Sequence, residues 1–128
     1  MLITSDLIRG HTETIILAQL MPHDSYGYEI GKAIQEKTGG RYELKEATLY
    51  SAFRRLENAQ LIRSYWGDGN TGARRRYYSI TELGRETYQQ NRQDWEKAKT
   101  ILDKLISIPV SQTGGLRSQD MPPPLRQG

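Results

Sequence analysis

Apolar residues recur at helical spacing through the first half of the chain and predict three short helices. The first spans residues 5–21, where apolar side chains recur every three or four positions until Pro22 stops the pattern. The second spans residues 25–38, with Ser25 as its expected N-cap and the glycines at 39–40 as its exit. The side chains of this second helix that we expect to face inward are Tyr28, Ile30, Ala33 and Ile34.

The third predicted helix spans residues 46–60 and has two distinct faces. Its buried stripe falls at helical spacing on Leu49, Ala52, Phe53 and Leu56. A rotation of about 100° per residue places the opposite face in solvent. That face carries small, hydroxyl, amide and guanidinium side chains: Ala47, Ser51, Arg54 and Asn58, flanked by Thr48 and Arg55.

A β-hairpin is predicted after the third helix. Residues 62–66 and 74–80 are rich in β-branched, aromatic and alternating residues, and the turn-forming residues 67–72 join them. Thr81 is the expected cap of a last helix that continues to about residue 107. This order of elements is that of a winged helix-turn-helix domain, a mainly α (α+β) fold, in which the third helix enters the major groove of DNA and the hairpin, or wing, reaches the adjacent backbone.

Two helices carry more apolar surface than one core needs. The second half of the first helix is apolar around more than one face. The last helix repeats a narrow apolar stripe every seven residues, with polar Asn91 at one expected apolar place, and this favours packing against another helix. The stripe consists of Tyr88, Trp95, Ala98, Leu102 and Leu105. We therefore expect a homodimer.

The predicted organisation has three parts. Residues 1–80 form a winged helix-turn-helix DNA-binding domain, and residues 81–108 form a C-terminal dimerisation helix. Residues 109–128 are expected to be a disordered tail, because their proline, glycine and polar content cannot bury enough apolar surface to offset the entropy of ordering.

Composition excludes several other functions. The chain has 128 residues and no cysteine, so neither disulfides nor thiolate metal sites are possible, and the cytoplasm is its expected location. His11 and His23 lie too far apart to ligate a metal from one helical face. The sequence shows no secretory signal, membrane-spanning stretch, nucleophile–base pair, paired carboxylates or phosphate-binding glycine loop. We therefore expect no cofactor, no metal, no membrane association and no enzymatic activity.

Positive charge is concentrated in the hairpin. The net charge is only +3, but residues 61–85 contain five arginines against two acidic residues. Arg74, Arg75 and Arg76 supply charge without sequence information, which would make DNA binding salt-dependent. Strand alternation sends Arg75 one way and the other two the opposite way, so the three need not touch phosphate together.

The exposed face of the third helix supplies groups that can read DNA. Arg54 and Arg55 can contact phosphates or read guanine O6 and N7. Thr48 and Ser51 can hydrogen-bond to base edges or phosphates, and Ala47 permits close approach and can touch a thymine methyl group.

Plainer interpretations exist for the same residues. Exposed arginines are often only solvated, although three adjacent arginines on a wing after such a helix favour DNA binding. Tyr26 can donate its hydroxyl to a phosphate, or it can be a core or helix-junction residue. Tyr50 has the same two interpretations.

Several segments resemble the PadR family of transcriptional regulators. They are SYGYEI at residues 25–30, EATLY at 46–50 with FRRLE at 53–57, and RRRYYSITELG at 74–84. The resemblance runs from about residue 7 to residue 105 with matching order and spacing. The single long helix after the wing, with Asp94 and Trp95 near its middle, is most similar to the subfamily with a short C-terminal region, which includes multidrug-binding repressors.

That resemblance implies a winged-helix dimer in which the last helix of each chain packs against the first and last helices of its partner. It also implies repression through a palindromic operator and release by a small molecule bound at the dimer interface, sandwiched by the tryptophan that Trp95 matches. The implied ligand-binding residues are Ile8, His11, Ile15, Gln19, Arg92, Trp95 and Lys99. Arg92 and Lys99 lie one turn to either side of Trp95. Their positive charges favour anionic or neutral planar aromatic ligands over cationic drugs. The alternative is that Trp95 only packs the dimer.

Two positions depart from the family pattern. Lys45 precedes the third helix where the family often has a capping Ser or Asn, so this cap is missing at a cost of about 1 kcal/mol. Lys45 is instead a candidate for phosphate contact. Residues 59–60, Ala-Gln, replace the usual glycine after the same helix, which should alter only the helix exit.

The predicted function is a homodimeric DNA-binding repressor released by a small planar aromatic effector. The alternative is a protein-interaction module that reuses the winged-helix scaffold without operator-specific DNA binding. Salt-sensitive binding to a two-fold symmetric operator separates the two functions.

Overall fold

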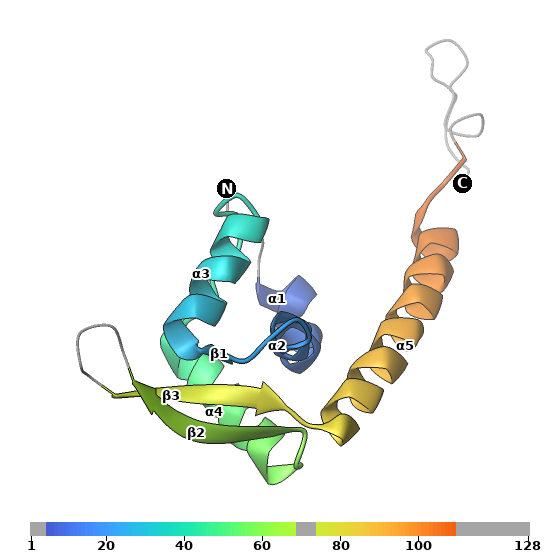
Figure 1. Cartoon of the computed structure of the whole chain (residues 1–128). Helices are drawn as coiled ribbons and strands as arrows, with labels where there is room; N and C mark the ends of the chain where they lie inside the picture. Colours follow the sequence, from blue (N-terminus) through green and yellow to red (C-terminus); the bar gives the residue numbers. More distant parts are fainter. Residues whose placement is uncertain (1–4, 69–73, 110–128) are drawn as a thin grey trace. The chain divides into compact units, whose positions relative to one another are not determined.

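A computed structural model of the chain describes residues 5–68 and 74–109. Their order is α1 (Ser5–Ile8), the 3₁₀ turn η1 (Arg9–His11), α2 (Thr12–Leu20), β1 (Ser25–Tyr26), α3 (Gly27–Lys37), α4 (Glu46–Asn58), β2 (Ile62–Asp68), β3 (Arg74–Ile80) and α5 (Glu82–Ile106) (Figure 1). The strands form one antiparallel sheet in the order β1-β3-β2. This mostly helical fold with a small sheet confirms the predicted winged-helix class.

The chain divides into two compact units, Met1–Arg92 and Gln93–Gly128, so α5 begins in the first unit and ends in the second. The core of the first unit forms where α2, α3 and α4 meet the sheet. The rings of Phe53 on α4 and Tyr78 on β3 stack there, with centroids 3.9 Å apart. The fully buried side chains around them are Ile16, Leu17, Leu20, Ile30, Leu56 and Ile62. The predicted buried stripe of α4 is confirmed, because none of its four residues is more than 4% exposed.

The start of the chain differs from its prediction as one continuous helix. A 3₁₀ turn, Arg9–His11, separates α1 from α2. Gly10 stands in this turn, and glycine is the residue, apart from proline, that least favours a helix interior. The hydroxyl of Thr12 donates to the carbonyl oxygen of Arg9 over 3.2 Å and so bonds the first residue of α2 back to the turn.

The prediction that Ser25 caps the second helix is wrong. Ser25 is buried in the short strand β1, which pairs with β3, and α3 therefore begins two residues later. The hydroxyl of Ser25 donates to the carboxylate of Glu29 instead. The inward placement of Tyr28 is also wrong: it is 71% exposed, because it precedes buried Ile30 by two positions, about 200° around the helix.

Helix exits and caps largely follow the sequence. The predicted glycine exit of α3 is confirmed, since Gly39 has φ +61° and the N–H of Gly40 donates to the carbonyl of Gln35 over 2.8 Å. The exit of α4 is bonded in the same way, since the N–H of Leu61 donates to the carbonyl of Leu56 over 2.9 Å, and Gln60, at φ 63°, stands where a glycine would normally stand. Lys45 occupies the N-cap of α4 and makes no side-chain cap bond, as predicted.

The predicted cap of α5 is confirmed. The N–H of Gly84 donates to Oγ1 of Thr81 over 3.0 Å, and the same hydroxyl donates to the carbonyl of Gln60 over 2.8 Å.

Asn91, the polar exception in the apolar stripe, donates to Oγ1 of Thr14 over 2.9 Å. The tip of the predicted turn, residues 69–73, and nearly all of the predicted tail, residues 110–128, lie outside the described residues. Within the described part, no helix is long and apolar enough to cross a membrane.

Candidate nucleic-acid interface

The outer face of α4 presents the side chains that the sequence predicted. Ala47, Thr48 and Arg54 are exposed, and Ser51 is half-buried. The buried stripe on the opposite side fixes this orientation, because it packs into the core of the unit. No described residue makes a hydrogen bond or ion pair with Arg54. This face therefore presents small Ala47, which permits close approach to a DNA groove, and the guanidinium of Arg54, which is available to bind DNA.

Arg55, although next to Arg54, is held by two side chains. Its Nε donates to Oε2 of Glu13 on α2 over 2.6 Å, and its Nη1 donates to Oγ of Ser51 over 3.3 Å. The side chains of Arg55 and Glu13 remain 53% and 42% exposed. The two adjacent arginines thus differ: one is available and one is anchored to the helix behind it.

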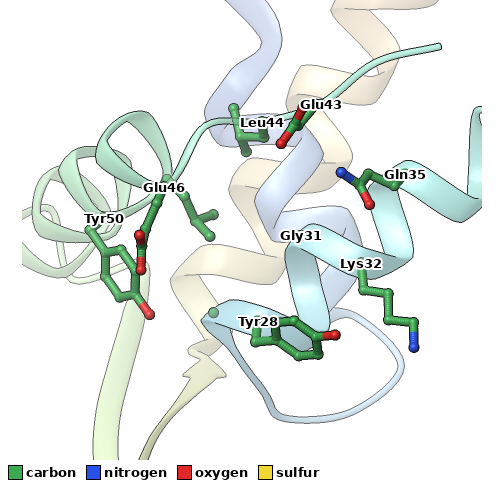
Figure 2. A pocket seen from close by; sticks show the side chains of 10 residues that line it. Tyr28, Gly31, Lys32, Gln35, Glu43, Leu44, Glu46 and Tyr50 are labelled. Carbon is green, nitrogen blue, oxygen red and sulfur yellow. The ribbon is translucent and has the colours of Figure 1, made fainter. Parts of the chain in front are cut away.

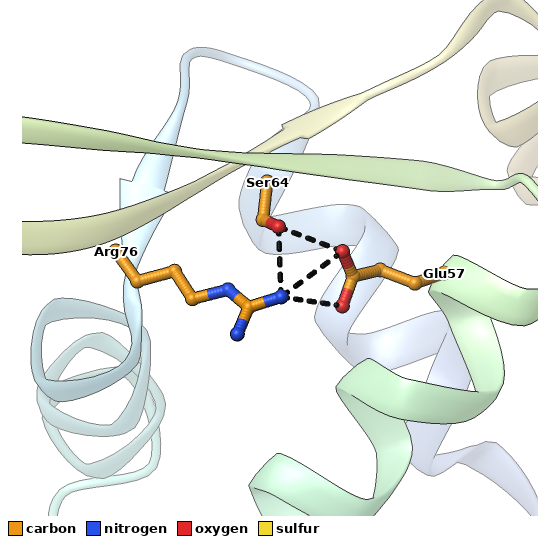
Figure 3. Close-up of polar contacts among 3 residues, drawn as sticks. All are labelled: Glu57, Ser64 and Arg76. Atoms are coloured by element: carbon orange, nitrogen blue, oxygen red, sulfur yellow. Dashed lines mark hydrogen bonds and ion pairs between the residues drawn. The ribbon is translucent and has the colours of Figure 1, made fainter.

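Arg76 ties the wing to α4. Its Nη2 lies 3.3 Å and 3.4 Å from the two carboxylate oxygens of Glu57 and donates to Oγ of Ser64 over 3.0 Å (Figure 3). Ser64 in turn donates to Glu57 over 2.7 Å. One wing arginine is therefore neutralised inside the protein, so the charge available to a polyanion is smaller than the run of three indicates.

The other two wing arginines rest on aromatic rings. The guanidinium of Arg75 lies 4.5 Å from the ring centroid of Tyr26, and that of Arg74 lies 5.4 Å from that of Trp66. The opposite directions of Arg75 and Arg76 confirm the predicted alternation. Tyr26 is half-buried at the junction of β1 and α3, so the helix-junction interpretation is confirmed, and a bond from its hydroxyl to phosphate stays a prediction.

Tyr50 closes the space between α4 and the start of α3. Its ring meets Phe53 edge-on with centroids 5.4 Å apart, and a Cβ added to Gly27 would collide with its hydroxyl. A larger residue at position 27 would therefore displace the ring of Tyr50. Tyr50 is still 37% exposed, so it joins the core and the surface, and both of its predicted interpretations stay open.

A groove of about 410 Å³ lies between α3 and α4 (Figure 2). Its lining residues are Gly27, Tyr28, Gly31, Lys32, Gln35, Glu43, Leu44, Glu46, Leu49 and Tyr50. Tyr28 and Lys32 line this groove from α3, and the sequence reasoning missed both as interface residues. The signal that could have found them is the periodicity of α3, since buried Ile30 and Ile34 leave both on the outer side.

The outer face of the sheet is aromatic. Tyr65 and Tyr77 stack with centroids 5.6 Å apart, and Tyr26 meets Tyr77 edge-on at 5.4 Å. The hydroxyl of Tyr65 donates to Oδ2 of Asp24 over 2.5 Å, and this hydrogen bond raises the pKa of Tyr65 above 10.0. This chain of rings supports Tyr26, on which Arg75 rests.

The predicted ligand residues fall in both units. Ile8, His11, Ile15, Gln19 and Arg92 belong to the first unit, and Trp95 and Lys99 belong to the second. Trp95 is 40% exposed, and Nζ of Lys99 lies 5.9 Å from its ring centroid and 3.1 Å from a carboxylate oxygen of Glu96. Gln19 accepts a hydrogen bond from Lys37 over 3.0 Å. The ligand site that these residues were expected to form stays a prediction.

Within the described ranges, no group of three or more His, Asp or Glu side chains is arranged to hold a metal ion.

Comparisons with known proteins agree with this arrangement. The model of the transcriptional regulator PadR-like family matches residues 16–90, which include α3, α4 and the wing. A transcriptional regulator from Clostridium thermocellum is similar in structure, with 48% identity, a TM-score of 0.76 and coverage of 83% of this chain and 100% of that one. A PadR family transcription regulator from Clostridium difficile shows 35% identity, a TM-score of 0.68 and coverage of 77% and 100%. An uncharacterized protein X from Lysinibacillus sphaericus is 42% identical over 80% of this chain and 94% of its own length.

Proposed function

Because the chain belongs to the PadR-like family of transcriptional regulators, we propose that it is a homodimeric repressor that binds a two-fold symmetric operator through α4 and the wing. The family resemblance predicted from the sequence is confirmed, and the family membership implies DNA-binding regulation. The likeness to the multidrug-binding subfamily remains a prediction. The observation that carries the proposal is the outer face of α4, where exposed Ala47 and Arg54 lie opposite the buried stripe.

The wing supports the same function. The guanidinium of Arg75 packs over the ring of Tyr26 at the start of α3. This contact positions the guanidinium without neutralising its charge, as an ion pair with a carboxylate would. Arg54, Arg75 and exposed Lys45 therefore supply the positive charge of the interface. Neutralising phosphates with these side chains would release counterions and make binding steeply salt-dependent.

The dimer is supported by the apolar stripe of α5. In the second unit, the stripe residues Trp95, Leu102 and Leu105 are between 40% and 77% exposed. Apolar side chains at this spacing on one long helix favour packing against another helix. Sedimentation analysis of the full chain should give a dimer, and Leu105→Glu should shift it to the monomer, with Lys97→Glu as the matched surface control. A monomeric wild-type chain at micromolar concentration would contradict this part of the proposal.

DNA binding is tested by fluorescence anisotropy on fragments of the protein's own promoter, with an unrelated fragment as competitor. Arg54→Ala and Arg75→Ala should each weaken binding, and Lys97→Ala, which removes an exposed cation from α5, should not. The alternative function, a protein-interaction module, predicts that neither arginine variant changes binding to any promoter fragment.

We propose that the effector is a planar aromatic molecule, neutral or anionic, that stacks on Trp95. The exposure of this ring supports the stacking, and the ammonium of Lys99, 5.9 Å from its centroid, disfavours a second cation, although pairing with Glu96 weakens this repulsion. Trp66→Phe leaves Trp95 as the sole tryptophan reporter. Its fluorescence should then be quenched more strongly by anionic than by cationic planar dyes, and equal binding of both would contradict the charge argument. Lys99→Met should reduce the difference.

A further inference from the structure

We infer that Arg55 reads a guanine in the operator and that Glu13 is the residue that positions it. This inference rests on the proposed function, because it names what one side chain of that interface recognises. It starts from the contrast between two neighbouring arginines: Arg55 donates to Glu13 over 2.6 Å and to Ser51 over 3.3 Å, whereas Arg54 has no such partner among the described residues.

The two contacts fix the guanidinium and leave its recognition edge unused. A guanidinium has five N–H donors in a planar fork, and Arg55 commits one on Nε and one on Nη1 to described side chains. One N–H on Nη1 and both on Nη2 remain. Each terminal nitrogen therefore keeps at least one donor, and a contact to O6 and N7 of guanine needs two. The side chain as a whole is 53% exposed, so it remains accessible from solvent.

The charge of the pair favours a base over a phosphate. Arg55 and Glu13 together carry no net charge, and a phosphate that approached this guanidinium would also approach the carboxylate of Glu13. Guanine O6 and N7 are uncharged acceptors, so they receive the two hydrogen bonds without this repulsion. Arg54 has no acidic partner among the described residues and keeps its full charge, which suits a phosphate contact.

Fixing the fork also matters for specificity. A bidentate contact to one base requires the plane of the guanidinium to match the plane of the base, whereas a phosphate accepts donors from many directions. Glu13 comes from α2 and Ser51 from the preceding turn of α4, so the fork is held from two sides. Such preorganisation reduces the side-chain freedom lost on binding.

The experiment first selects the preferred operator of the full-length wild-type chain from random duplexes. It then measures binding to that operator and to its single-base variants over a range of salt concentrations. Arg55→Lys and Arg55→Ala should lose the preference for guanine at one base pair in each half-site, by about fivefold to 100-fold, with an unchanged dependence of log K on log salt. Arg54→Ala should instead weaken binding to all sequences and reduce the salt slope by about 0.9.

Glu13 is tested by two variants. Glu13→Ala should reduce discrimination at the same base pair while strengthening binding to non-specific DNA, because it removes a negative charge next to the DNA. Glu13→Gln keeps an oxygen that accepts from Nε and should retain part of the discrimination. If Glu13 served only the fold, discrimination and non-specific binding would fall together with the unfolding temperature, and the inference would be overturned.

Two further results would overturn the assignment of Arg55. A uniform loss of affinity with a smaller salt slope in Arg55→Ala would show a phosphate contact, and unchanged binding would show that the ion pair serves only to join α4 to α2. A wild-type chain with no preferred sequence would instead refute the proposed function itself. The two failures are thus distinguishable.

Discussion

Replacing Gly84 with alanine should strongly destabilise the first unit, because no space exists for the added methyl group. Gly84 is buried in the first turn of α5. A Cβ there would lie 2.7 Å from Cγ1 of Ile80 and 3.1 Å from the carbonyl carbon of Leu61, and closer still to the oxygen of that carbonyl. The oxygen accepts from the N–H of Thr81 over 3.0 Å, so it is fixed by the chain itself and cannot move as a flexible side chain would.

The magnitude follows from three contributions. Overpacking against backbone costs about 1 to 3 kcal/mol, and the displaced start of α5 would weaken the bonds made by Thr81, each of which contributes about 1 kcal/mol. Alanine recovers about 1 kcal/mol through its better helix propensity. The expected net loss is about 3 kcal/mol, which lowers the unfolding temperature of a domain of this size by at least about 10 °C.

Gly31 provides the matched control. It lies inside α3, and a Cβ there would meet no atom within 4 Å. Gly31→Ala should therefore stabilise the protein by about 0.5 to 1 kcal/mol. Thermal unfolding followed by circular dichroism, at equal protein concentrations, measures both variants. A loss below about 1 kcal/mol in Gly84→Ala, or shifts of the same sign in the two variants, would refute this packing argument.

Three further predictions concern α4, the wing and the buried tyrosines. Gln60→Gly should stabilise the protein by about 0.5 to 1 kcal/mol, because it removes a side chain from a backbone position in the left-handed region while the backbone hydrogen bonds at the end of α4 remain. An unchanged denaturation midpoint would contradict this prediction. Glu57→Ala should cost about 1 kcal/mol in unfolding experiments, and more than Ser64→Ala, because it removes the acceptor for both Ser64 and Arg76. Burial raises the pKa of Tyr42 and of Tyr78 above 10.0, so the contribution of these two groups to stability should be constant below pH about 10 and should fall above it, because the unfolded chain loses protons that the folded chain keeps. Tyr78→Phe should make the alkaline loss smaller, and an equal loss in both proteins would count against this cause.

The helices and the wing were predictable because local patterns determine them. The stripe of Leu49, Phe53 and Leu56 repeats at helical spacing, and its opposite face follows from rotation alone. Thr81 and Gly39 act within a few residues of the helix ends that they form. These signals are contained in short segments, so one sequence is enough to read them.

Features that depend on distant contacts were not predictable. Ser25 was expected to be a cap, but its segment pairs with residues about 50 positions later in β3, and no local pattern indicates this pairing. The pairing of Arg55 with Glu13 and of Arg76 with Glu57 depends on which helix and strand pack together. The sequence therefore indicated where cations gather, whereas the structure shows which of them are already bound by acids.

The exposed side chains of α3 were also assigned incompletely from the sequence. Tyr28 was expected to face inward because it is apolar and near Ile30, although the two positions between them turn it about 200° around the helix. The same rotation places Tyr28 and Lys32, four positions apart, on one side of the helix beside the groove.

Chemical footprinting of the full chain on its own promoter shows whether α4 enters the major groove of a two-fold operator. We expect two protected half-sites about one or two helical turns apart, with guanine N7 in the major groove shielded from methylation. Ala47→Glu should abolish this protection while the protein stays folded, because it places a charged carboxylate on the exposed face of α4. An absence of protection in the wild-type chain, or the same footprint with Ala47→Glu, would contradict the claim.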